Sequence, residues 1–448
     1  MTGARAAPGR VHVVGAGLAG LAAAVDLSGR GYAVTLYESG RQAGGRCRSF
    51  GDAELGVRID NGNHLLLSGN AAAMDYIGRI GALATFEQPD EAAIPFIDLA
   101  TGERWTVRPS AGPIPWWVLR ASRRIPGTRA RDYLGALRLW RAAPDAAVAA
   151  ALPVDSMLYR RLWQPLAVAA LNTAAEDGSA HLLWRILVET LGRGAAACRP
   201  LVARDGLSES LVDPALAFLA RYGGAVQFGA RLRAIDFAAD RVIGLHFDGE
   251  TVHLAPTDAA ILAVPAAVAA RLVPGLVVPD DYAPIVNAHF RCALPPSAPL
   301  LVGIIGGTAE WLFRKREVAS VTVSAADRLV DWPADELAQS LWRDVARVIG
   351  CPPAPAPPCR IVKERRATFR ATPAQLRRRP AAATRWNNFL LAGDYVESGL
   401  PATIEGAIRS GFAAAARARR GRSPAPAASA APAMRHSAAN KDCQRALP

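Results

Sequence analysis

Residues 11–20 read VHVVGAGLAG and lead directly into the alanine-rich run LAAAVDLSGRGY. An apolar run that breaks into a GxGxxG turn and then opens onto a helix-forming segment predicts a strand, a tight turn and a helix. The first glycine permits the turn, the second lets the backbone approach a pyrophosphate, and the third lets the helix pack on the strand. The stretch therefore predicts a dinucleotide site built by Gly15, Ala16, Gly17, Leu18, Ala19 and Gly20.

A second predicted strand, AVTLYE, ends at Glu38, 18 residues beyond Gly20. At this spacing a carboxylate reaches the ribose hydroxyls of an adenosine, and Ser39 is its neighbour. The next stretch, SGRQAGGRCRSF, contains Gly44, Gly45 and Arg46. Glycine amides and an arginine fork suit phosphate oxygens, although a flexible solvated loop would also explain this stretch by itself.

A late segment completes the pattern. Residues 389–394, FLLAGD, predict a strand ending at Gly393 and Asp394, and a helix is expected to begin near Thr403 and Ile404. Together the four elements resemble the flavin amine oxidase and phytoene desaturase superfamily, in which they hold FAD. The resemblance implies that Asp394 contacts the cofactor phosphate or ribitol and that the late helix faces the isoalloxazine ring. It also places a backbone contact to adenine at Leu232, on an expected strand AVQFGARLRAI.

The expected fold class is α/β, a Rossmann-like FAD-binding domain of the glutathione-reductase or amine-oxidase type with an interleaved α+β substrate domain. Each domain is expected to be discontinuous. The FAD-binding domain takes residues 1–85, 200–275 and 386–420, the substrate domain takes 86–199, expected to be mostly helical, and 276–385, and residues 421–448 form a disordered tail.

Composition limits the alternatives. The chain has 448 residues and a net charge of +13, but no nucleic-acid-binding motif, and no apolar run is long enough to span a membrane. The N-terminus is too short before the first strand for a signal peptide, which predicts a cytoplasmic protein. Six scattered cysteines predict free thiols and no metal site, and Cys47 is expected to pack as a small apolar residue.

One segment combines positive charge with aromatic residues. Residues 115–141 read PWWVLRASRRIPGTRARDYLGALRLWR, with three tryptophans, seven arginines and one acid. Such a stretch could lie in the lipid headgroup region at the inner face of the cytoplasmic membrane. A helical hairpin packed within the substrate domain, with its arginines in water, would explain it equally well.

Two further signatures narrow the family. Residues 59–67 read IDNGNHLLL, and residues 162–173 contain LWQPL and AALNT. They resemble the squalene-associated FAD-dependent group, the bacterial hydroxysqualene dehydroxylases of hopanoid synthesis. The resemblance implies reductive removal of a hydroxyl from hydroxysqualene, with Gly62 and Asn63 beside the flavin. The candidate catalytic residues are His64, Asp60 and Asn172, of which the first two are the possible proton donors.

Structural roles explain the same residues without catalysis. His64 could be a buried histidine that bonds a backbone carbonyl, and Asn172 could be a helix cap. Three other functions stay open: a carotenoid desaturase or isomerase, an amine oxidase, and a non-catalytic flavin-binding partner of an upstream squalene or phytoene synthase. An amine oxidase usually has a lysine near the flavin, and only Lys315 and Lys363 precede the tail.

Overall fold

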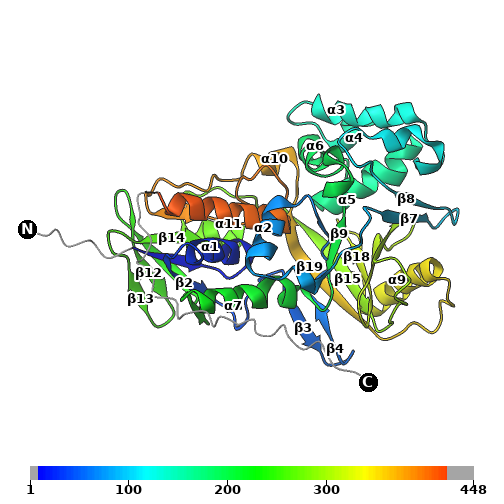
Figure 1. Cartoon of the computed structure of the whole chain (residues 1–448). Helices are drawn as coiled ribbons and strands as arrows, with labels where there is room; N and C mark the ends of the chain where they lie inside the picture. The colour runs from blue at the N-terminus through cyan, green and yellow to red at the C-terminus, as the bar shows by residue number, and fades with distance from the viewer. Residues whose placement is uncertain (1–8, 421–448) are drawn as a thin grey trace, which may run out of the picture.

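The computed structural model describes residues 9–420, so the predicted tail at 421–448 lies outside the described residues. Its nucleotide-binding part is centred on a five-stranded parallel sheet (Figure 1). The strand order is β10-β2-β1-β14-β20. The strands are β1 (Arg10–Val14), β2 (Ala33–Glu38), β10 (Ala225–Phe228), β14 (Ala259–Leu262) and β20 (Phe389–Leu391). Segments more than 300 residues apart in the chain thus share one sheet.

Helices pack against this sheet. They are α1 (Leu18–Ser28), α2 (Ala71–Arg79), α7 (Asp213–Arg221), α8 (Ala266–Leu272) and α11 (Ile404–Ala418). Every residue of α1 is buried, which explains its alanine-rich sequence, and α1 lies directly against α11 (Figure 1). A Cβ atom at Gly411 would lie 2.1 Å from the carbonyl oxygen of Ala19, so the two helices touch backbone to backbone.

A seven-stranded mixed sheet forms the second layer of the molecule, in the order β19-β15-β18-β17-β16-β7-β8. Its strands are β7 (Ile94–Asp98), β8 (Arg104–Val107), β15 (Tyr282–Phe290), β16 (Leu301–Ile305), β17 (Trp311–Arg314), β18 (Ala319–Val323) and β19 (Cys359–Phe369). The helix α9 (Ala334–Ile349) packs against it. In the chain, β7 and β8 precede the nucleotide-binding segment at 200–262 and the other strands of this sheet follow it. The two groups nevertheless form one sheet, in which β7 pairs in parallel with β16.

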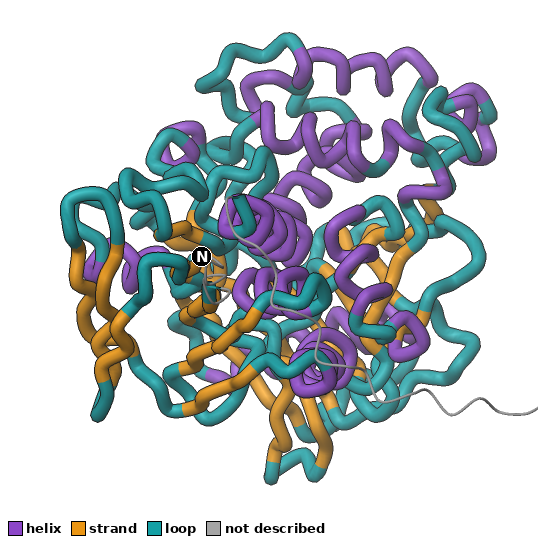
Figure 2. Tube along the Cα trace, turned by 60° about the vertical axis from the view of Figure 1, so that its left-hand side comes forward, coloured by secondary structure: helices purple, strands orange, loops and turns teal. Residues whose placement is uncertain are grey.

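Helices and short helical turns make a third layer at the top of Figures 1 and 2. They are η2 (Trp116–Leu119), η3 (Ala121–Arg123), η4 (Ala130–Ala136), α3 (Leu137–Trp140), α4 (Val148–Ala151), η5 (Tyr159–Trp163), α5 (Gln164–Leu171), α6 (Ala180–Glu189), η6 (Leu191–Arg193) and η7 (Ala195–Ala197). Trp163 and Leu171, from the family signature at residues 162–173, belong to the apolar core of this layer.

Smaller elements connect the layers. They are β3 (Ser49–Asp52), β4 (Val57–Asp60), β5 (Leu66–Leu67), η1 (Leu83–Thr85), β6 (Phe86–Glu87), β9 (Pro200–Ala203), η8 (Ser208–Val212), β11 (Leu232–Phe237), β12 (Val242–Phe247), β13 (Thr251–His253) and α10 (Pro373–Leu376). The single strand expected for AVQFGARLRAI is wrong. Gly229, with φ of +73°, ends β10 before the chain enters β11 in a different sheet.

Two other expectations need correction. The middle region starts with the strands β6 to β8 before it becomes helical. Residues 115–141 do not form a regular helical hairpin, because 3-10 turns and the one-turn helix α3 divide them. Within residues 9–420, no helix combines the length and the apolar character needed to cross a bilayer.

Candidate cofactor and active site

The first glycine loop connects β1 to α1 in a conformation that only small residues permit. Gly15 has φ of +104°, and its Cβ would lie 2.4 Å from the carbonyl oxygen of Ala263. A Cβ at Gly20 would lie 1.9 Å from the carbonyl oxygen of Gly15. Backbone packing within the protein therefore requires both glycines.

Gly17 differs from its neighbours. It caps the N-terminus of α1, yet a Cβ there would meet nothing within 4 Å. The first turn of α1 holds no acidic residue and receives no side-chain cap, so its backbone amides and its positive dipole end are available to an anion. A cradle that is open only at Gly17 fits a pyrophosphate.

Glu38 lies beside this loop. Its Oε2 accepts a hydrogen bond from the backbone N–H of Ala16 at 2.9 Å, and its Oε1 accepts from the N–H of Gly40 at 2.8 Å. The Ser39 hydroxyl bonds the same Oε1 at 3.2 Å. The carboxylate is thus held at the end of β2, where the ribose of an adenosine would lie.

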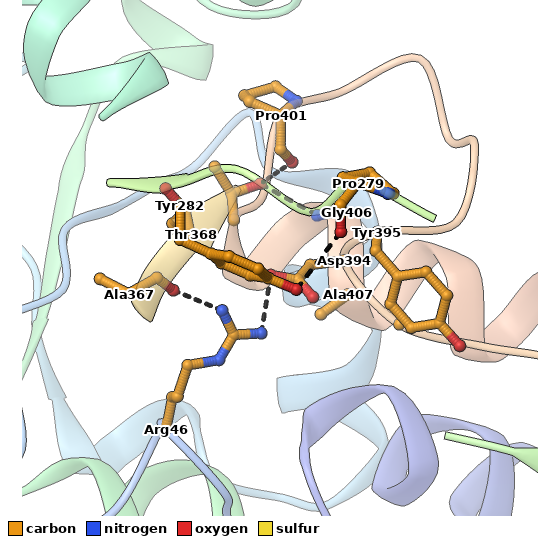
Figure 3. A network of polar contacts seen from close by, with 12 residues as sticks. Arg46, Pro279, Tyr282, Ala367, Thr368, Asp394, Tyr395, Pro401, Gly406 and Ala407 are labelled. Carbon is orange, nitrogen blue, oxygen red and sulfur yellow. Dashed lines mark hydrogen bonds and ion pairs between the residues drawn. The ribbon is translucent and has the colours of Figure 1, made fainter. Parts of the chain in front are cut away.

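The second glycine loop lies alongside the first. The N–H of Gly44 donates to the carbonyl oxygen of Ala16 at 2.8 Å, and Gly17 forms a parallel bridge with Gly44. Arg46 then crosses to the late segment, where its Nη2 contacts Asp394 Oδ2 at 2.7 Å and its Nη1 donates to the carbonyl oxygen of Ala367 (Figure 3). The carboxylate of Asp394 raises the pKa of Arg46, which keeps the guanidinium charged.

The late segment closes the cradle. Asp394 follows β20, and the N–H of Gly393 donates to Ser410 Oγ in α11 at 2.9 Å. Thr403 caps α11, because its hydroxyl accepts a hydrogen bond from the Gly406 N–H at 3.1 Å. Ile404, the first residue of the helix, is buried.

Leu232 lies at the start of β11, two residues after a segment that bonds the end of β2. The chain approaches it along β2, since the Ala230 N–H donates to the carbonyl oxygen of Glu38 at 2.8 Å and the Gly229 N–H donates to that of Gly40 at 3.0 Å. A backbone contact from this segment to an adenine is consistent with that position.

The glycine loops, Glu38 and the late aspartate therefore come together at the carboxyl ends of parallel strands. This is where open α/β sheets bind nucleotides. The open face at Gly17, a cation at residue 46 and a free helix N-terminus match the charge and shape of a dinucleotide pyrophosphate.

Asp60 ends β4 in a buried ion pair. Its Oδ2 lies 3.1 Å from Lys315 Nζ, and its Oδ1 accepts hydrogen bonds from Ser49 Oγ at 2.7 Å and from the Leu207 N–H at 2.8 Å. Burial acts to raise the pKa of Asp60, but the Lys315 ammonium and these hydrogen bonds outweigh it and hold the pKa below its ordinary value. Asp60 is therefore ionised at neutral pH.

His64 lies four residues further along the same segment. Neither ring nitrogen has a hydrogen bond partner in the described part of the chain, in contrast to a structural histidine that bonds a backbone carbonyl. Burial lowers the pKa of His64 to about 4, against the opposing effect of Asp60. The neutral imidazole keeps both nitrogens available to a ligand.

Gly62 and Asn63, which lie between Asp60 and His64 in the chain, contact β15 and β18. The Asn63 amide nitrogen Nδ2 donates to Thr322 Oγ1 at 3.0 Å, and Thr322 donates in turn to Asn287 Oδ1 at 2.7 Å. A Cβ at Gly62 would lie 3.0 Å from Asn287 Nδ2. A larger residue at position 62 would require the Asn287 side chain to shift by a few tenths of an ångström.

Asn172 is placed differently. It has φ of +46° and ends α5, so its backbone is in the left-handed conformation that asparagine tolerates. Its Nδ2 donates to the carbonyl oxygen of Ala283 and to Thr368 Oγ1, and its Oδ1 accepts from the Ala325 N–H at 2.7 Å. These contacts join the helical layer to the mixed sheet and occupy the side-chain amide of Asn172.

Other residues considered from the sequence have ordinary environments. Lys363 donates its ammonium to the carbonyl oxygen of Trp332 near the surface. Cys47 is buried, which raises the pKa of its thiol and disfavours the reactive thiolate. Every cysteine in residues 9–420 is a free thiol, and no cluster of metal ligands is found there.

Sequence reasoning missed two polar residues around Asp60 and Asn63, and it did not pair Lys315 with Asp60. Asn287 and His289 are buried on β15, where His289 Nδ1 bonds Ser320 Oγ at 2.6 Å, and Lys315 follows β17. A usable signal was present: PIVNAHF places two polar side chains at alternate positions of an otherwise apolar strand.

Comparisons with known proteins show the family and the fold of this chain. The model of the flavin containing amine oxidoreductases matches residues 18–419. The hydroxysqualene dehydroxylase of Rhodopseudomonas palustris is 50% identical over 90% of this chain and 97% of its own length. That of Sinorhizobium fredii is 47% identical over 91% of this chain and 98% of its own length. The solved structure of cyclohexylamine oxidase from Brevibacterium oxydans covers 92% of this chain and 99% of its own, with a TM-score of 0.65 at 15% identity, and so shares the fold.

The fold and the cradle define a flavin-dependent oxidoreductase with FAD as its cofactor, which confirms the predicted fold class and cofactor. The chain belongs to the flavin containing amine oxidoreductase family and, within it, to the hydroxysqualene dehydroxylase group.

Proposed function

We propose that this chain is an FAD-dependent enzyme that removes the hydroxyl group of hydroxysqualene reductively to give squalene, for squalene and hopanoid synthesis. The identity of 45–50% to three hydroxysqualene dehydroxylases, each over about nine-tenths of the chain, carries the proposal. The built cradle at Gly17, Arg46 and Asp394 supports the cofactor that such a reaction needs.

The reaction replaces a C–O bond by a C–H bond. The alcohol oxygen takes a proton and leaves as water, and the carbon, ionised and stabilised by its alkenyl neighbours, takes a hydride. Bound reduced FAD supplies the hydride. The chain must therefore orient the hydroxyl, hold a proton near it and keep bulk water away from the cation.

His64 is our candidate for the residue that contacts the hydroxyl. Its ring nitrogens are free of protein partners, and the segment ends in the apolar run Leu65–Leu67, which suits a hydrocarbon neighbour. In the resting protein its ring is neutral, since its pKa is about 4. A negatively charged ligand beside the ring would raise that pKa and let the imidazole carry the proton.

Asp60 serves this proposal as a fixed charge. Its pKa is lowered by Lys315 and by two hydrogen bonds, so it is unsuited to donating a proton at neutral pH. A carboxylate near His64 stabilises an imidazolium, and the pair with Lys315 holds that carboxylate in place. We therefore assign the proton to His64 and a positioning role to Asp60.

The test is an anaerobic single turnover. The purified holoenzyme is reduced with dithionite and mixed with hydroxysqualene, while flavin absorbance is followed and the lipid is extracted for mass spectrometry. Squalene formed in step with flavin reoxidation supports the proposal. Reduced flavin that persists with unchanged alcohol contradicts it and favours an oxidative desaturase or a non-catalytic flavin carrier.

Amine oxidation is the least favoured alternative. Lys363, one of only two lysines before the tail, directs its amine to Trp332 near the surface. The other, Lys315, is engaged by Asp60 and by the carbonyl oxygen of Ala203 at 2.8 Å. The surface position of Lys363 and the two acceptors that already hold Lys315 disfavour both as a lysine that positions a water at the flavin.

We also propose that the enzyme works in the cytoplasm, against the inner face of the membrane that dissolves its substrate. Trp116 and Leu119 are 60% and 61% exposed, whereas Trp117 packs in the core against Tyr133. Large exposed apolar side chains with arginines nearby are typical of a membrane-facing surface. The variant Trp116→Ser/Leu119→Ser should lose vesicle binding while keeping its FAD; unchanged binding would refute this contact.

A further inference from the structure

A cavity of about 590 Å³ lies between β8 and η3, far along the chain from the glycine loops. Four of its nine lining residues are arginines and none is acidic. The lining residues are Arg104, Trp105, Thr106, Arg108, Ala121, Ser122, Arg123, Arg124 and Pro126.

The positive charges of this cavity are poorly neutralised. In the part of the chain that the structure describes, no carboxylate lies within ion-pair distance of Arg104, Arg123 or Arg124. Arg108 has only Glu91, at 3.8 Å, with a side chain that is mostly exposed. Gathered cations without acids raise the local potential and favour an anion.

The nearby carboxylates do not neutralise the arginines of this cavity, because they form ion pairs with Arg161. Asp98 Oδ2 and Glu103 Oε2 lie 3.0 and 2.6 Å from the buried guanidinium of Arg161, which also lies over the ring of Trp105. The cavity therefore keeps its positive charge even though two carboxylates flank β8.

Trp105 lines the cavity with its ring. It is 8% exposed and stacks on Phe96, with ring centroids 5.8 Å apart. Its indole nitrogen is buried, so the arginines, and not the indole, provide the hydrogen-bond donors of the cavity.

Apolar side chains surround the same region. Trp116 and Leu119, in the turn immediately before the lining residues, are exposed, as are Leu134 and Trp140 in η4 and α3. The turns η2 and η4 are held together by an edge contact of 5.1 Å between Trp117 and Tyr133. In Figure 1 this layer, marked by α3 and α4, lies at the opposite end of the molecule from β12 and β13.

We infer that this arginine cavity binds the phosphate group of an anionic phospholipid, while the neighbouring Trp and Leu side chains enter the headgroup region. Arginine forks bind phosphate oxygens in pairs. The inference rests on the proposed membrane contact and assigns it a specific lipid site. Phospholipid binding in this cavity would direct the helical layer to the bilayer that holds the apolar substrate.

The experiment compares two matched double variants of the full-length holoenzyme. Arg123→Gln/Arg124→Gln removes two charges from the cavity, and Arg131→Gln/Arg138→Gln removes two exposed charges that do not line it. Both are tested by cosedimentation with phosphatidylcholine vesicles, with and without phosphatidylglycerol. Equal FAD content and equal Tm show that both variants fold.

The cavity variant should lose about tenfold or more in affinity for the anionic vesicles, and the control variant about threefold or less. Wild-type binding should weaken with salt. Equal losses in both variants, or salt-independent binding, would overturn the site. A third outcome is that inorganic phosphate stabilises the wild type but not the cavity variant, while the two bind vesicles equally. That outcome would assign the cavity to a free phosphate compound and would overturn the phospholipid site.

Turnover of hydroxysqualene in neutral detergent separates this inference from the proposed reaction. The cavity variant should retain wild-type turnover there, since its substitutions lie outside the cofactor cradle. Failure of turnover in the wild type would refute the reaction and leave the lipid result intact.

Discussion

The buried pair of Asp60 and Lys315 permits a quantitative test. Lys315→Met keeps an apolar stem but removes the ammonium that lies 3.1 Å from Asp60 Oδ2. Both side chains are at most 10% exposed, so the carboxylate would stay buried without its counter-charge. Breaking such a pair costs about 3–5 kcal/mol. With an unfolding entropy of about 2 cal/mol/K per residue, this lowers the Tm of a chain of about 400 residues by about 4–6 °C.

The loss should depend on pH. In the wild type the pKa of Asp60 lies below its ordinary value, so its stabilising contribution is present above the unfolded-state pKa and disappears only as the pH falls through the folded-state pKa. Without Lys315, burial should raise that pKa above the unfolded value. The penalty then acts at neutral pH and fades as the pH falls, so the Tm gap should narrow between about pH 7.5 and 5.

Differential scanning fluorimetry of the holoenzyme measures both effects. Lys363→Met is the matched control, because its ammonium contacts only the carbonyl oxygen of Trp332 near the surface. The double variant Lys315→Met/Asp60→Asn should recover at least about half of the loss, since an asparagine oxygen still accepts from Ser49 and Leu207. Equal Tm values for the two lysine variants at neutral pH would refute the reasoning.

Three further predictions follow from single residues. Gly17→Ala should fold normally but bind FAD about tenfold or more weakly, because its Cβ would enter the open cradle, whereas the Cβ of Gly20→Ala would meet backbone and should lower the Tm sharply. Titration with FAD measures the first effect and scanning fluorimetry the second. Normal FAD affinity of Gly17→Ala would contradict the cradle. Burial raises the pKa of Glu310 to about 7, above its unfolded-state value, so it favours the fold at low pH and opposes it as the pH rises through 7. Glu310→Gln should therefore raise Tm at about pH 8 by an amount that vanishes near pH 4, and a pH-independent change would exclude this explanation. His64→Ala should keep its FAD but slow squalene formation in the single turnover by about 100-fold or more, and an unchanged rate would remove His64 from the proton path.

Local sequence determined much of the nucleotide-binding half. Gly15, Gly17 and Gly20 could be recognised because their spacing reflects a turn that forms between adjacent elements, and Glu38 follows at the end of the next strand. In these cases the physical constraint lies within about 30 neighbouring residues, so the pattern alone carries it. The domain limits stay a prediction.

Tertiary structure decided the rest. Arg46 meets Asp394 across 348 positions, and Asp60 meets Lys315 across 255, and no local spacing encodes either pair. Trp116 and Trp117 are neighbours in sequence, but the first is exposed and the second is buried. Only the packing of η2 on η4 decides this difference in exposure. The sequence by itself thus determined the position of the phosphate cradle, because the glycine turns depend on local backbone geometry. Its motifs also carried the resemblance that indicated the family and the cofactor. The charges around Asp60 and His64 and the arginine cavity were decided by the tertiary structure, since burial and distance between remote residues arise only when the sheets and the helical layer pack together.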